Sequence, residues 1–485
     1  MKIRAQQRKR GGAESPTMNP TQRHFSLNRA ASKNQIPMSV MLFIGKCLPA
    51  TLVVPILFFG VVPMATAQTI EYVDQFGTSS FEDARRVAAD STGVYVVGRT
   101  GGALPGQPGP FCPFNAYIRK YDFTSGSGAV LLWTREFCTL AGDQALGVAV
   151  TPPGPLTPAV YVIGTTDGAG AFIRKYSQAG LLVWTIPFAS GIDNERVSGV
   201  AADQSGVYVV GQTSGNLFGP NCGVSDAFVV KYDHAGACLW EDQFGTSDYD
   251  DARDVVVADS PNRVYVVGVT QGNLFGVSFG GFDSFIRKYE PDGTVVKNGG
   301  WGGGGPASSG CAPAGGLSGG VQFGSSGDDF AGGIAAGNGS LYVVGTIGGG
   351  GGTAFISKYN TAGTFEWEDK FGTYPSDITY GRYVAVKSSE IYVVGSTAGS
   401  PGGPNNGEFD AYIRKYNPAG KLDKGWGIGG TLQFGSPDRD FADGAAVDSS
   451  GGLYVVGTTH GSLVSPPGPP AGISTPDAFL AKIKP

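Results

Sequence analysis

Seven short segments of the chain are apolar at nearly every position, and each ends in glycine. They are variants of V-Y-V-V-G that end at Gly98, Gly164, Gly211, Gly268, Gly345, Gly395 and Gly457. Valine and tyrosine favour β-strands, and a strand that is apolar along its whole length is expected to be buried on both faces. The pattern predicts a repeated all-β architecture in which every unit contributes one fully buried strand.

We call each of these segments strand b. Three further strands are expected around each one. A strand of small residues, strand a, precedes it (RRVAAD, GVAAD, GAAVD), and a tight turn joins the two. A variable loop leads to strand c (NAYIRKY, DAFVVKY), and a second turn leads to strand d, which ends in phenylalanine (LLWTREF, CLWEDQF). Gly, Asp, Ser and Asn in the connections are typical turn residues, so each unit is predicted to be a sheet of four short strands.

The two ends of the chain indicate how these units are arranged. A radial array of four-stranded units is a β-propeller, whereas an open solenoid needs capping units at its ends. The last unit stops after strand c at residues 477–483, and an additional strand d, IEYVDQF at 70–76, precedes the first unit. These two ends complete each other if the ring closes without a free sheet edge. We therefore predict a seven-bladed β-propeller with four antiparallel strands per blade, in which strand 70–76 completes the last blade.

The repeat resembles the SBBP β-propeller repeat of exported bacterial and archaeal proteins. The resemblance rests on the strings D-A-x-x-V-A-x-D, G-x-Y-V-V-G-x-T and D-A-F-[IV]-x-K-Y, and it covers nearly all of residues 69–485. It implies display outside the cell or at the cell surface, without a defined biochemical role. Two Gly-rich segments, 298–320 and 424–430, depart from the repeat because they lengthen the connection between strands c and d. Their composition predicts mobile loops.

Residues 1–67 differ from the repeats. A basic, polar segment at 1–37 is followed by an apolar segment at 38–67 that ends in Ala65-Thr66-Ala67. This is the layout of a secretory signal with an A-x-A cleavage site. The alternative is an uncleaved anchor, because about 20 apolar residues can just span a bilayer. Three prolines interrupt the stretch, so we predict a basic leader with a cleaved signal peptide, an extracellular or cell-surface location, and no membrane span after cleavage.

The charge of the remaining chain is strongly negative. Residues 1–67 hold nine of the 35 Lys and Arg residues but only one of the 40 Asp and Glu residues, so residues 68–485 carry a net charge of −13. A nucleic-acid backbone is bound by clustered positive charge. Nucleic acid is therefore not expected as a partner.

The loops between strands b and c are the expected binding elements. In a β-propeller strand a lines the central channel, and the b–c loops and d–a connections emerge on one face, which we call the loop face. The b–c loops are long and dissimilar in the first, third, fourth and seventh units, whereas the a–b turns are tight. Variable loops on a rigid scaffold commonly bind ligands, so a protein or a glycan is expected there. Drift in unselected loops is the alternative.

One acidic residue opens strand a in six of the seven units. These candidate ligand-binding residues are Glu82, Asp143, Glu195, Asp250, Asp329 and Asp440. Asp377 lies close to this position in the sixth unit. All are expected near the channel mouth, the end of the channel on the loop face, where a ring of carboxylates could bind Ca²⁺ or a cationic ligand. The alternative is that each acid caps a turn within its own blade. No Ca²⁺-loop spacing is present, so no metal site is predicted.

Two further positions repeat in strand c. Every unit carries a lysine, at Lys120, Lys175, Lys231, Lys288, Lys358, Lys415 and Lys482. A lysine at a fixed position inside a strand is expected to place its ammonium against carbonyls or carboxylates between blades, so we interpret these residues as structural. The residue that opens strand c is also polar, as in Asn115, Asp226, Asp283, Asp410 and Asp477, and is interpreted as closing the preceding loop.

Five cysteines follow the predicted signal peptide. Cys112, in a b–c loop, and Cys138, just after strand d, are both expected on the loop face of the first blade and are predicted to pair. Cys238, next to a c–d turn, and Cys311, in the next c–d insertion, are expected on the opposite face and are predicted to pair as well. Cys222 lies at the other end of strand c from Cys238, beyond the roughly 6 Å Cα separation of a disulfide. Cys222 is therefore predicted to be free.

Motifs of known enzyme classes are absent from the sequence. His234 and His460 are the histidines after residue 67; they are expected on opposite faces and cannot form a triad or a metal site. Catalysis by carboxylates alone, as in glycoside hydrolysis, stays open, but no unequal acid pair and no channel-facing cluster of Tyr, Arg or His stands out. The predicted function is that of a non-enzymatic, monomeric binding or surface-display propeller. The alternatives are a carbohydrate-active hydrolase or lyase that uses channel-mouth carboxylates, and a purely structural surface protein.

Overall fold

The computed structural model describes most of the chain after residue 69. The described residues are 70–108, 112–124, 128–139, 141–155, 157–167, 170–188, 195–258, 262–302, 309–348, 352–372, 378–463 and 475–484. They belong to one compact unit, Pro63–Pro485. The predicted leader and signal peptide lie outside the described residues. Within the described ranges, no helix has the length and apolarity that a membrane span requires.

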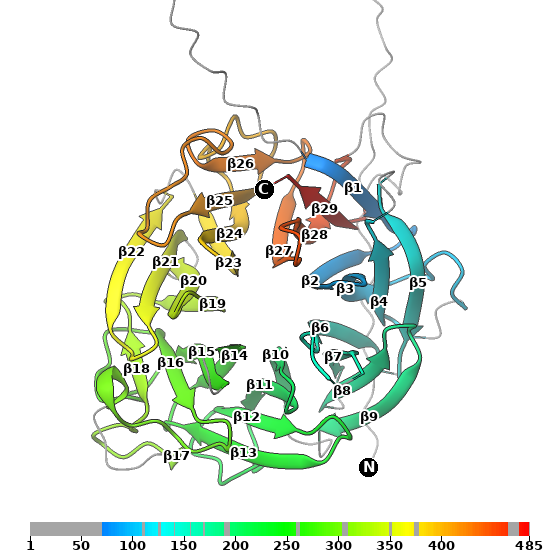
Figure 1. Cartoon of the computed structure of the whole chain (residues 1–485). Helices are drawn as coiled ribbons and strands as arrows, with labels where there is room; N and C mark the ends of the chain where they lie inside the picture. Colours follow the sequence, from blue (N-terminus) through cyan, green and yellow to red (C-terminus); the bar gives the residue numbers. More distant parts are fainter. Residues whose placement is uncertain are drawn as a thin grey trace, which may run out of the picture. The chain divides into compact units, whose positions relative to one another are not determined.

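Seven sheets stand around a central channel (Figure 1). Strand a is β2 (Glu82–Asp90), β6 (Asp143–Val150), β10 (Arg196–Ala202), β14 (Asp250–Ala258), β19 (Asp329–Gly337), β23 (Thr379–Lys387) and β27 (Asp440–Val447). Strand b is β3 (Gly93–Thr100), β7 (Ala159–Thr166), β11 (Val207–Thr213), β15 (Arg263–Thr270), β20 (Ser340–Ile347), β24 (Glu390–Thr397) and β28 (Leu453–Thr459). Each strand a contacts the strand a of both neighbouring sheets, and β27 contacts β2, so the ring is closed.

The outer strands complete the blades. Strand c is β4 (Asn115–Asp122), β8 (Gly170–Ser177), β12 (Asp226–Tyr232), β16 (Asp283–Tyr289), β21 (Thr353–Asn360), β25 (Asp410–Tyr416) and β29 (Asp477–Ile483). Strand d is β5 (Val130–Phe137), β9 (Leu182–Phe188), β13 (Cys238–Gly245), β18 (Gly320–Phe323), β22 (Phe365–Phe371), β26 (Thr431–Phe434) and β1 (Ile70–Phe76). The predicted seven-bladed propeller is confirmed.

The seventh blade is built from both ends of the chain. β1 pairs antiparallel with β29, with Val73 opposite Ala481 and Phe76 opposite Ala478. The sheet order is β1, β29, β28, β27. The predicted closure of the ring by strand 70–76 is therefore confirmed, and the outer edge of β29 is covered.

The apolar V-Y-V-V-G strands form the core. In the described residues, each junction between neighbouring blades holds one cluster of buried apolar side chains, and strand b contributes to both clusters beside it. The glycine that ends the motif is needed for close packing. A Cβ at Gly98 would lie 1.9 Å from the carbonyl oxygen of Asp83 on β2, so no larger residue fits.

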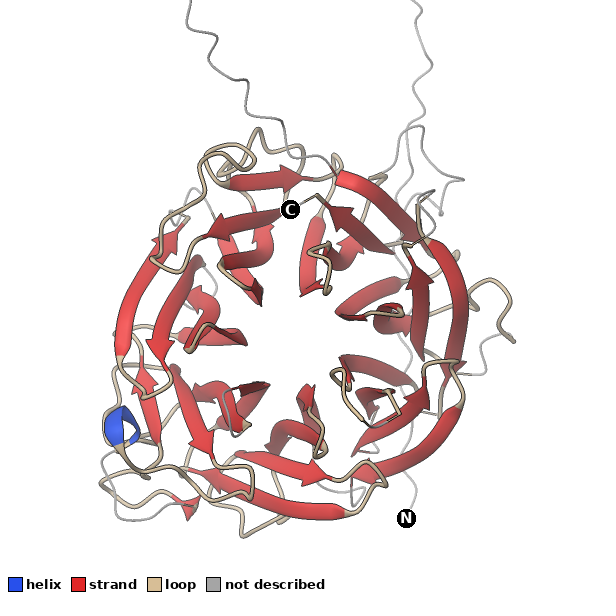
Figure 2. Cartoon of the chain, in the orientation of Figure 1, coloured by secondary structure: helices blue, strands red, loops and turns tan. Residues whose placement is uncertain are grey.

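The two Gly-rich insertions replace part of a shortened strand d. In blades 4 and 6 this strand has four residues, and the insertion supplies the missing tryptophan. Trp301 ends the single described helical turn, η1 (Gly299–Trp301) (Figure 2). It is 1% exposed, and its indole N–H donates to Thr361 O at 3.1 Å. Trp133, Trp184, Trp240 and Trp367 of regular d strands make the same contact with the turn of the next blade. The insertions therefore contribute to the junctions between blades.

Candidate functional site

Every inner strand carries a β-bulge at the same place. The pairing of strands a and b shifts register around one residue in each blade, and these bulge residues are Arg85, Leu146, Ser198, Arg253, Gly332, Arg382 and Asp443. A bulge redirects a side chain out of the alternating pattern of a strand. All seven bulge residues line one cavity of about 320 Å³ in the channel. The bulge therefore turns one residue of each blade toward the cavity, and in every blade except the fifth, which has Gly332, that residue carries a side chain.

The cavity lies at the channel mouth. The bulges occupy the first half of the inner strands, and strand a starts at the end of the blade where the b–c loops emerge. The cavity is lined by five arginines (Arg85, Arg86, Arg196, Arg253 and Arg382) and two aspartates (Asp251 and Asp443), a net charge of +3. Guanidinium groups bind carboxylate, sulfate and phosphate by paired N–H donors. A small positive site therefore lies within an acidic protein.

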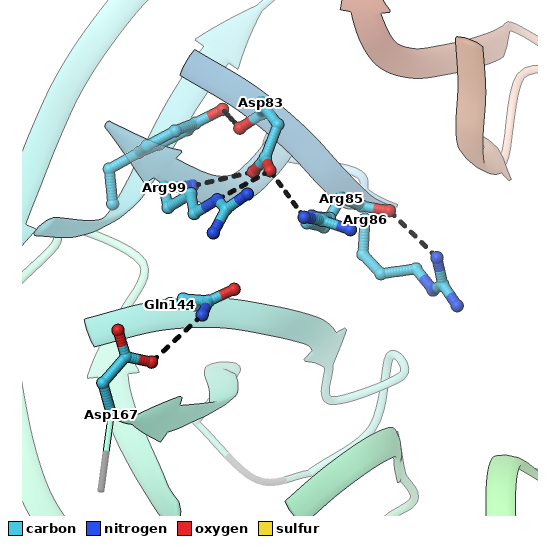
Figure 3. A network of polar contacts seen from close by, with 7 residues as sticks. Asp83, Arg85, Arg86, Arg99, Gln144 and Asp167 are labelled. Carbon is cyan, nitrogen blue, oxygen red and sulfur yellow. Dashed lines mark hydrogen bonds and ion pairs between the residues drawn. The ribbon is translucent and has the colours of Figure 1, made fainter. Parts of the chain in front are cut away.

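Several of these arginines are held in place by neighbouring groups. Asp83 Oδ2 lies 2.7 Å from an Arg85 nitrogen and 3.0 Å from Arg99 Nε (Figure 3). Arg86 donates to the backbone carbonyl of Asp443 at 2.7 Å and lies over the Tyr383 ring, 4.8 Å from its centre. Groups fixed in this way do not have to be ordered when a ligand binds.

Two arginines of the cavity form no close ion pair among the described residues. Among the described residues, no carboxylate oxygen lies within 4.0 Å of the guanidinium nitrogens of Arg196 or Arg382. Both residues are exposed, and the Arg382 guanidinium lies over the Tyr380 ring at 5.3 Å. These two cations are available to a ligand.

The two aspartates of the cavity are withdrawn from water to different degrees: Asp251 is 4% exposed, and Asp443 is half-buried. Burial raises the pKa of Asp443, and Arg382 and Arg85 partly oppose this effect. Burial also raises the pKa of Asp251, opposed by Arg253 and Arg196. The channel-facing cluster of arginine and tyrosine side chains was missed in the sequence analysis. The sequence signal for this cluster is the residue type at the bulge position. It varies between units, while the residues on either side of it repeat.

Aromatic side chains surround the positive cavity. Tyr249 and Phe330 line it directly. Phe282 joins them, with ring centres 5.6 Å from Tyr249 and 5.1 Å from Phe330. In blades 6 and 7, Phe409 lies between Tyr380 and Phe441, with ring centres 5.9 and 5.7 Å apart. The channel mouth thus combines cations with flat apolar faces.

The predicted ring of acids is buried next to this cavity but does not line it. Glu82, Asp143, Glu195, Asp250, Asp329 and Asp440 are each at most 4% exposed. Most bind hydroxyl or amide groups of the turn before their own strand: Asp250 Oδ2 accepts from Thr246 N and Oγ1 at 2.6 and 2.8 Å, and Asp440 from Ser436 in the same way. This geometry matches the turn-capping alternative.

The sixth blade has a hydroxyl where the other blades have an acid. Thr379 Oγ1 lies 2.8 Å from Thr397 Oγ1, and Asp377 lies outside the described residues. Within the described ranges, no three His, Cys, Asp or Glu side chains converge as a metal site would require.

The polar residues that open strand c hold the b–c loops. Gln243, near the end of strand d, donates to Asp226 Oδ2 at 2.9 Å and accepts from the loop amides of Leu217 and Phe218 at 3.0 Å. The same pattern recurs with Gln322 and Asp283, with Gln433 and Asp410, and with Gln75 and Asp477. These loops are fixed to the blades at their bases, as the loop-closing interpretation predicts.

Most of the strand-c lysines connect neighbouring blades, whereas Lys415 and Lys482 form ion pairs within their own blades. The ammonium groups of Lys175, Lys231, Lys288 and Lys358 donate to a carbonyl in the c–d turn of the next blade, at 2.6 to 3.1 Å. Lys415 and Lys482 pair with Glu390 and Glu71 at 2.6 and 3.3 Å. The structural interpretation of these lysines is confirmed.

The two histidines lie apart and serve the fold. His234 Nδ1 is 2.5 Å from the Tyr161 hydroxyl, and the His234 carbonyl accepts from Lys175. His460 is exposed in the seventh b–c loop, and its ring packs edge-on against Phe441. Neither histidine lines the cavity.

The disulfides differ in part from the sequence analysis. Cys112 and Cys138 are joined as expected, with Cα atoms 6.3 Å apart. Cys311 is joined to Cys222, not to Cys238, with Cα atoms 5.1 Å apart, and Cys238 is the free cysteine. The reason is the path of the insertion: β17 (Gly310–Cys311) pairs with the end of β13, with Cys311 opposite Gly245. The insertion therefore crosses the outer edge of blade 3 and reaches the loop face.

Comparisons with known proteins add little to this description. No protein-family model and no curated protein matches the chain, so the SBBP family stays a prediction. Among solved structures, it is similar to a protein of unknown function from Bacteroides caccae (13% identity, 70% of this chain and 94% of that chain, TM-score 0.35). It is also similar to a subtype N10 neuraminidase-like protein of A/little yellow-shouldered bat/Guatemala (9%, 86% and 100%, 0.37) and to a protein of unknown function from Dyadobacter fermentans (10%, 86% and 99%, 0.41). No activity carries over at these values, and the fold rests on the chain's own strand pairing.

Proposed function

We propose that the chain is an exported, non-enzymatic binding propeller that meets a protein or a glycan on its loop face. The observation that carries this proposal is the channel-mouth cavity, because it places two unpaired arginines at the centre of that face. A cavity with a few convergent polar groups and aromatic walls is the usual form of a binding site.

The b–c loops around the cavity are suited to binding because they are ordered by the blades. Strand-d glutamines bind the loop amides of Leu217, Leu274 and Leu463 at 2.9 to 3.0 Å. Loops that are already fixed lose little conformational entropy on association.

Apolar side chains are exposed on two of these loops. Val224 in the third b–c loop is 66% exposed, and Val277 and Phe279 in the fourth are 51% and 44% exposed. Exposed apolar groups on two neighbouring loops are typical of an interaction surface.

A glycan-array and protein pull-down screen of residues 68–485 tests the proposal. A variant with V224A, V277A and F279A is expected to lose retention of the ligand found. The matched control is L182A, which removes a side chain that is 51% exposed on the outer strand β9. Absence of any ligand, or equal loss in the control, would contradict binding on the loop face.

A carbohydrate-active hydrolase or lyase is the second candidate. One observation favours it: Asp251 and Asp443 line the cavity beside arginines, and burial raises the pKa of both carboxyl groups, as general acids require. Incubation with uronate polysaccharides should then release reducing or unsaturated ends, and D251N and D443N should abolish this release. Binding without product formation supports the non-enzymatic function.

A further inference from the structure

We propose that the channel-mouth cavity binds the carboxylate or sulfate group of an acidic sugar, with Arg196 and Arg382 as the residues that contact the oxyanion. This inference rests on the proposed function and specifies the ligand class of the same site. It follows from the charge, the arrangement of the arginines, the size of the cavity and its aromatic walls.

The charge of the cavity calls for an anion. The arginines come from four different inner strands, β2, β10, β14 and β23, and converge on one space of about 320 Å³. Like charges that converge repel each other, and they do so more strongly where water is partly excluded. Asp83 and Asp251 neutralise Arg85 and Arg253, whereas Arg196 and Arg382 have no carboxylate partner among the described residues. Arg382 and Arg196 interact with Asp443 and Asp251 only beyond ion-pair distance, so an anionic ligand would supply the close counter-charge.

The arginines are arranged to recognise a particular oxyanion and not only to attract negative charge. Arg86 Nη1 donates to the carbonyls of Arg85 and Asp443 at 3.0 and 2.7 Å, so this nitrogen helps to support the wall of the cavity. The Arg382 guanidinium lies over the Tyr380 ring at 5.3 Å, and the side chain is exposed, so its N–H groups can reach a ligand. A planar donor edge matches the two oxygens of a carboxylate or sulfate.

The size and walls of the cavity favour a sugar over a bare anion. Ligand pockets of about 300 Å³ lie at the lower end of the usual range, so one or two sugar rings fill this space and an inorganic sulfate occupies a small part of it. The rings of Tyr249 and Phe330 line the same cavity and offer an apolar face with one hydroxyl, suited to a partly polar ring. A long polyanion is disfavoured, because residues 68–485 carry a net charge of −13.

Isothermal titration calorimetry with defined probes tests the inference. The probes are di- and trigalacturonate, a 6-sulfated galactose, the corresponding neutral galactose oligomers, AMP and inorganic sulfate. Residues 68–485 are expected to bind at least one of the first two probes, with Kd rising steeply with salt. The neutral oligomers, AMP and sulfate are expected to bind at least 10-fold more weakly. A preference for the carboxylate or for the sulfate identifies which of the two oxyanions is bound.

The variants R196A and R382A distinguish binding at this site from general electrostatic attraction to the protein. Each is expected to raise Kd about 10- to 100-fold, as loss of a hydrogen bond to a charged group does. Both side chains are exposed, so the melting temperature should change little. The control is R263A, which removes an ion pair with Glu290 at the start of strand b, at the opposite end of the blade from the channel mouth.

The possible failures have different meanings. If neutral sugars bind equally well, if sulfate or AMP binds as tightly as the acidic sugars, or if R263A weakens binding as much as R382A, the inference is overturned. If a ligand binds the loop face and is lost only in the Val224, Val277 and Phe279 variant, the inference fails and the proposed function stands. If no protein or glycan binds at all, both fail.

Discussion

Gln75 donates a hydrogen bond of 2.8 Å to Asp477, a residue 402 positions further along the chain. The same contact joins Gln243 to Asp226 and Gln433 to Asp410 within blades made of continuous chain. The seventh blade is therefore closed by the interaction that holds the other blades together.

Removal of residues 69–76 should open the ring. β1 buries Phe76 between Tyr117 and the Arg119 guanidinium, which lies 3.9 Å from the centre of the Phe76 ring. Loss of one buried Phe costs about 3–5 kcal/mol, so loss of the strand is expected to lower the free energy of unfolding by more than about 5 kcal/mol. Chemical denaturation measures this. The control is deletion of 105–108 in the first b–c loop, which should cost far less; equal stability of the two deletions would refute closure by β1.

Trp301 should contribute as much stability as a tryptophan of a regular strand. It is 1% exposed and donates to Thr361 O, as Trp367 donates to Pro418 O in the next blade. W301A and W367A are each expected to lower the unfolding free energy by about 3–5 kcal/mol. W301F keeps most of the packing and should cost about 1 kcal/mol from the lost hydrogen bond. A W301A variant as stable as the parent would show that the insertion does not support the blade junction.

Alkylation of the unfolded, unreduced protein should label one thiol in residues 68–485. Cys238 is expected to carry the label, since Cys112 pairs with Cys138 and Cys222 with Cys311. C238S should leave stability unchanged, whereas C311S should expose a second thiol at Cys222. Because the Cys222–Cys311 bond closes a loop of about 90 residues, C311S is expected to cost about 4 kcal/mol. Labelling of Cys222 in the parent protein would overturn the pairing.

Asp250 should make the protein more stable in mild acid. Burial, with a contribution from Asp226, raises the pKa of Asp250 to about 6, above about 3.9 in an unfolded chain. Between about pH 4 and 6, the folded state therefore keeps a proton on Asp250 that the unfolded state has already released. The stability from this group is complete below about pH 4 and is lost as the pH rises through about 6, by about 3 kcal/mol at 1.36 kcal/mol per pKa unit.

Denaturation of the parent and of D250N at pH 4.5 and 7.5 measures this effect. Because an asparagine does not titrate, the stability difference between the parent and D250N should shift in favour of D250N as the pH rises. Carboxyl groups with lowered pKa values, such as Asp448, change stability with pH in the opposite direction. They are present in both proteins, so their contribution cancels in this difference. A difference that is constant with pH would contradict the raised pKa of Asp250.

The blades and their closure could be predicted because they depend on local patterns. The V-Y-V-V-G strings are buried on both faces, and the strand at 70–76 resembles strand d of other units. The candidate site could not be predicted in this way. A β-bulge breaks the two-residue alternation of strand a, so Arg85, Arg253 and Arg382 face the cavity although simple alternation does not indicate it.

The disulfide of Cys311 was assigned wrongly for a related reason. Topology fixes the face on which a connection starts, but a long insertion can cross the sheet edge before it returns. Residues 310–311 do so by pairing with the end of β13. The pairing partner of Cys311 therefore depends on the course of the insertion, which the repeat pattern does not describe.

The pairing of β1 with β29 has a consequence for the order of folding. During synthesis β1 is made first, yet its partner at Asp477–Ile483 is made about 400 residues later. Domains ordinarily fold from their N-terminal part as the chain emerges, but this strand has to wait unpaired until nearly the whole chain is available. A chain cut short at its C-terminus therefore leaves β1 and β28 as free edges, which are sites of aggregation, so the last seven-residue strand decides whether a complete, closed protein is formed.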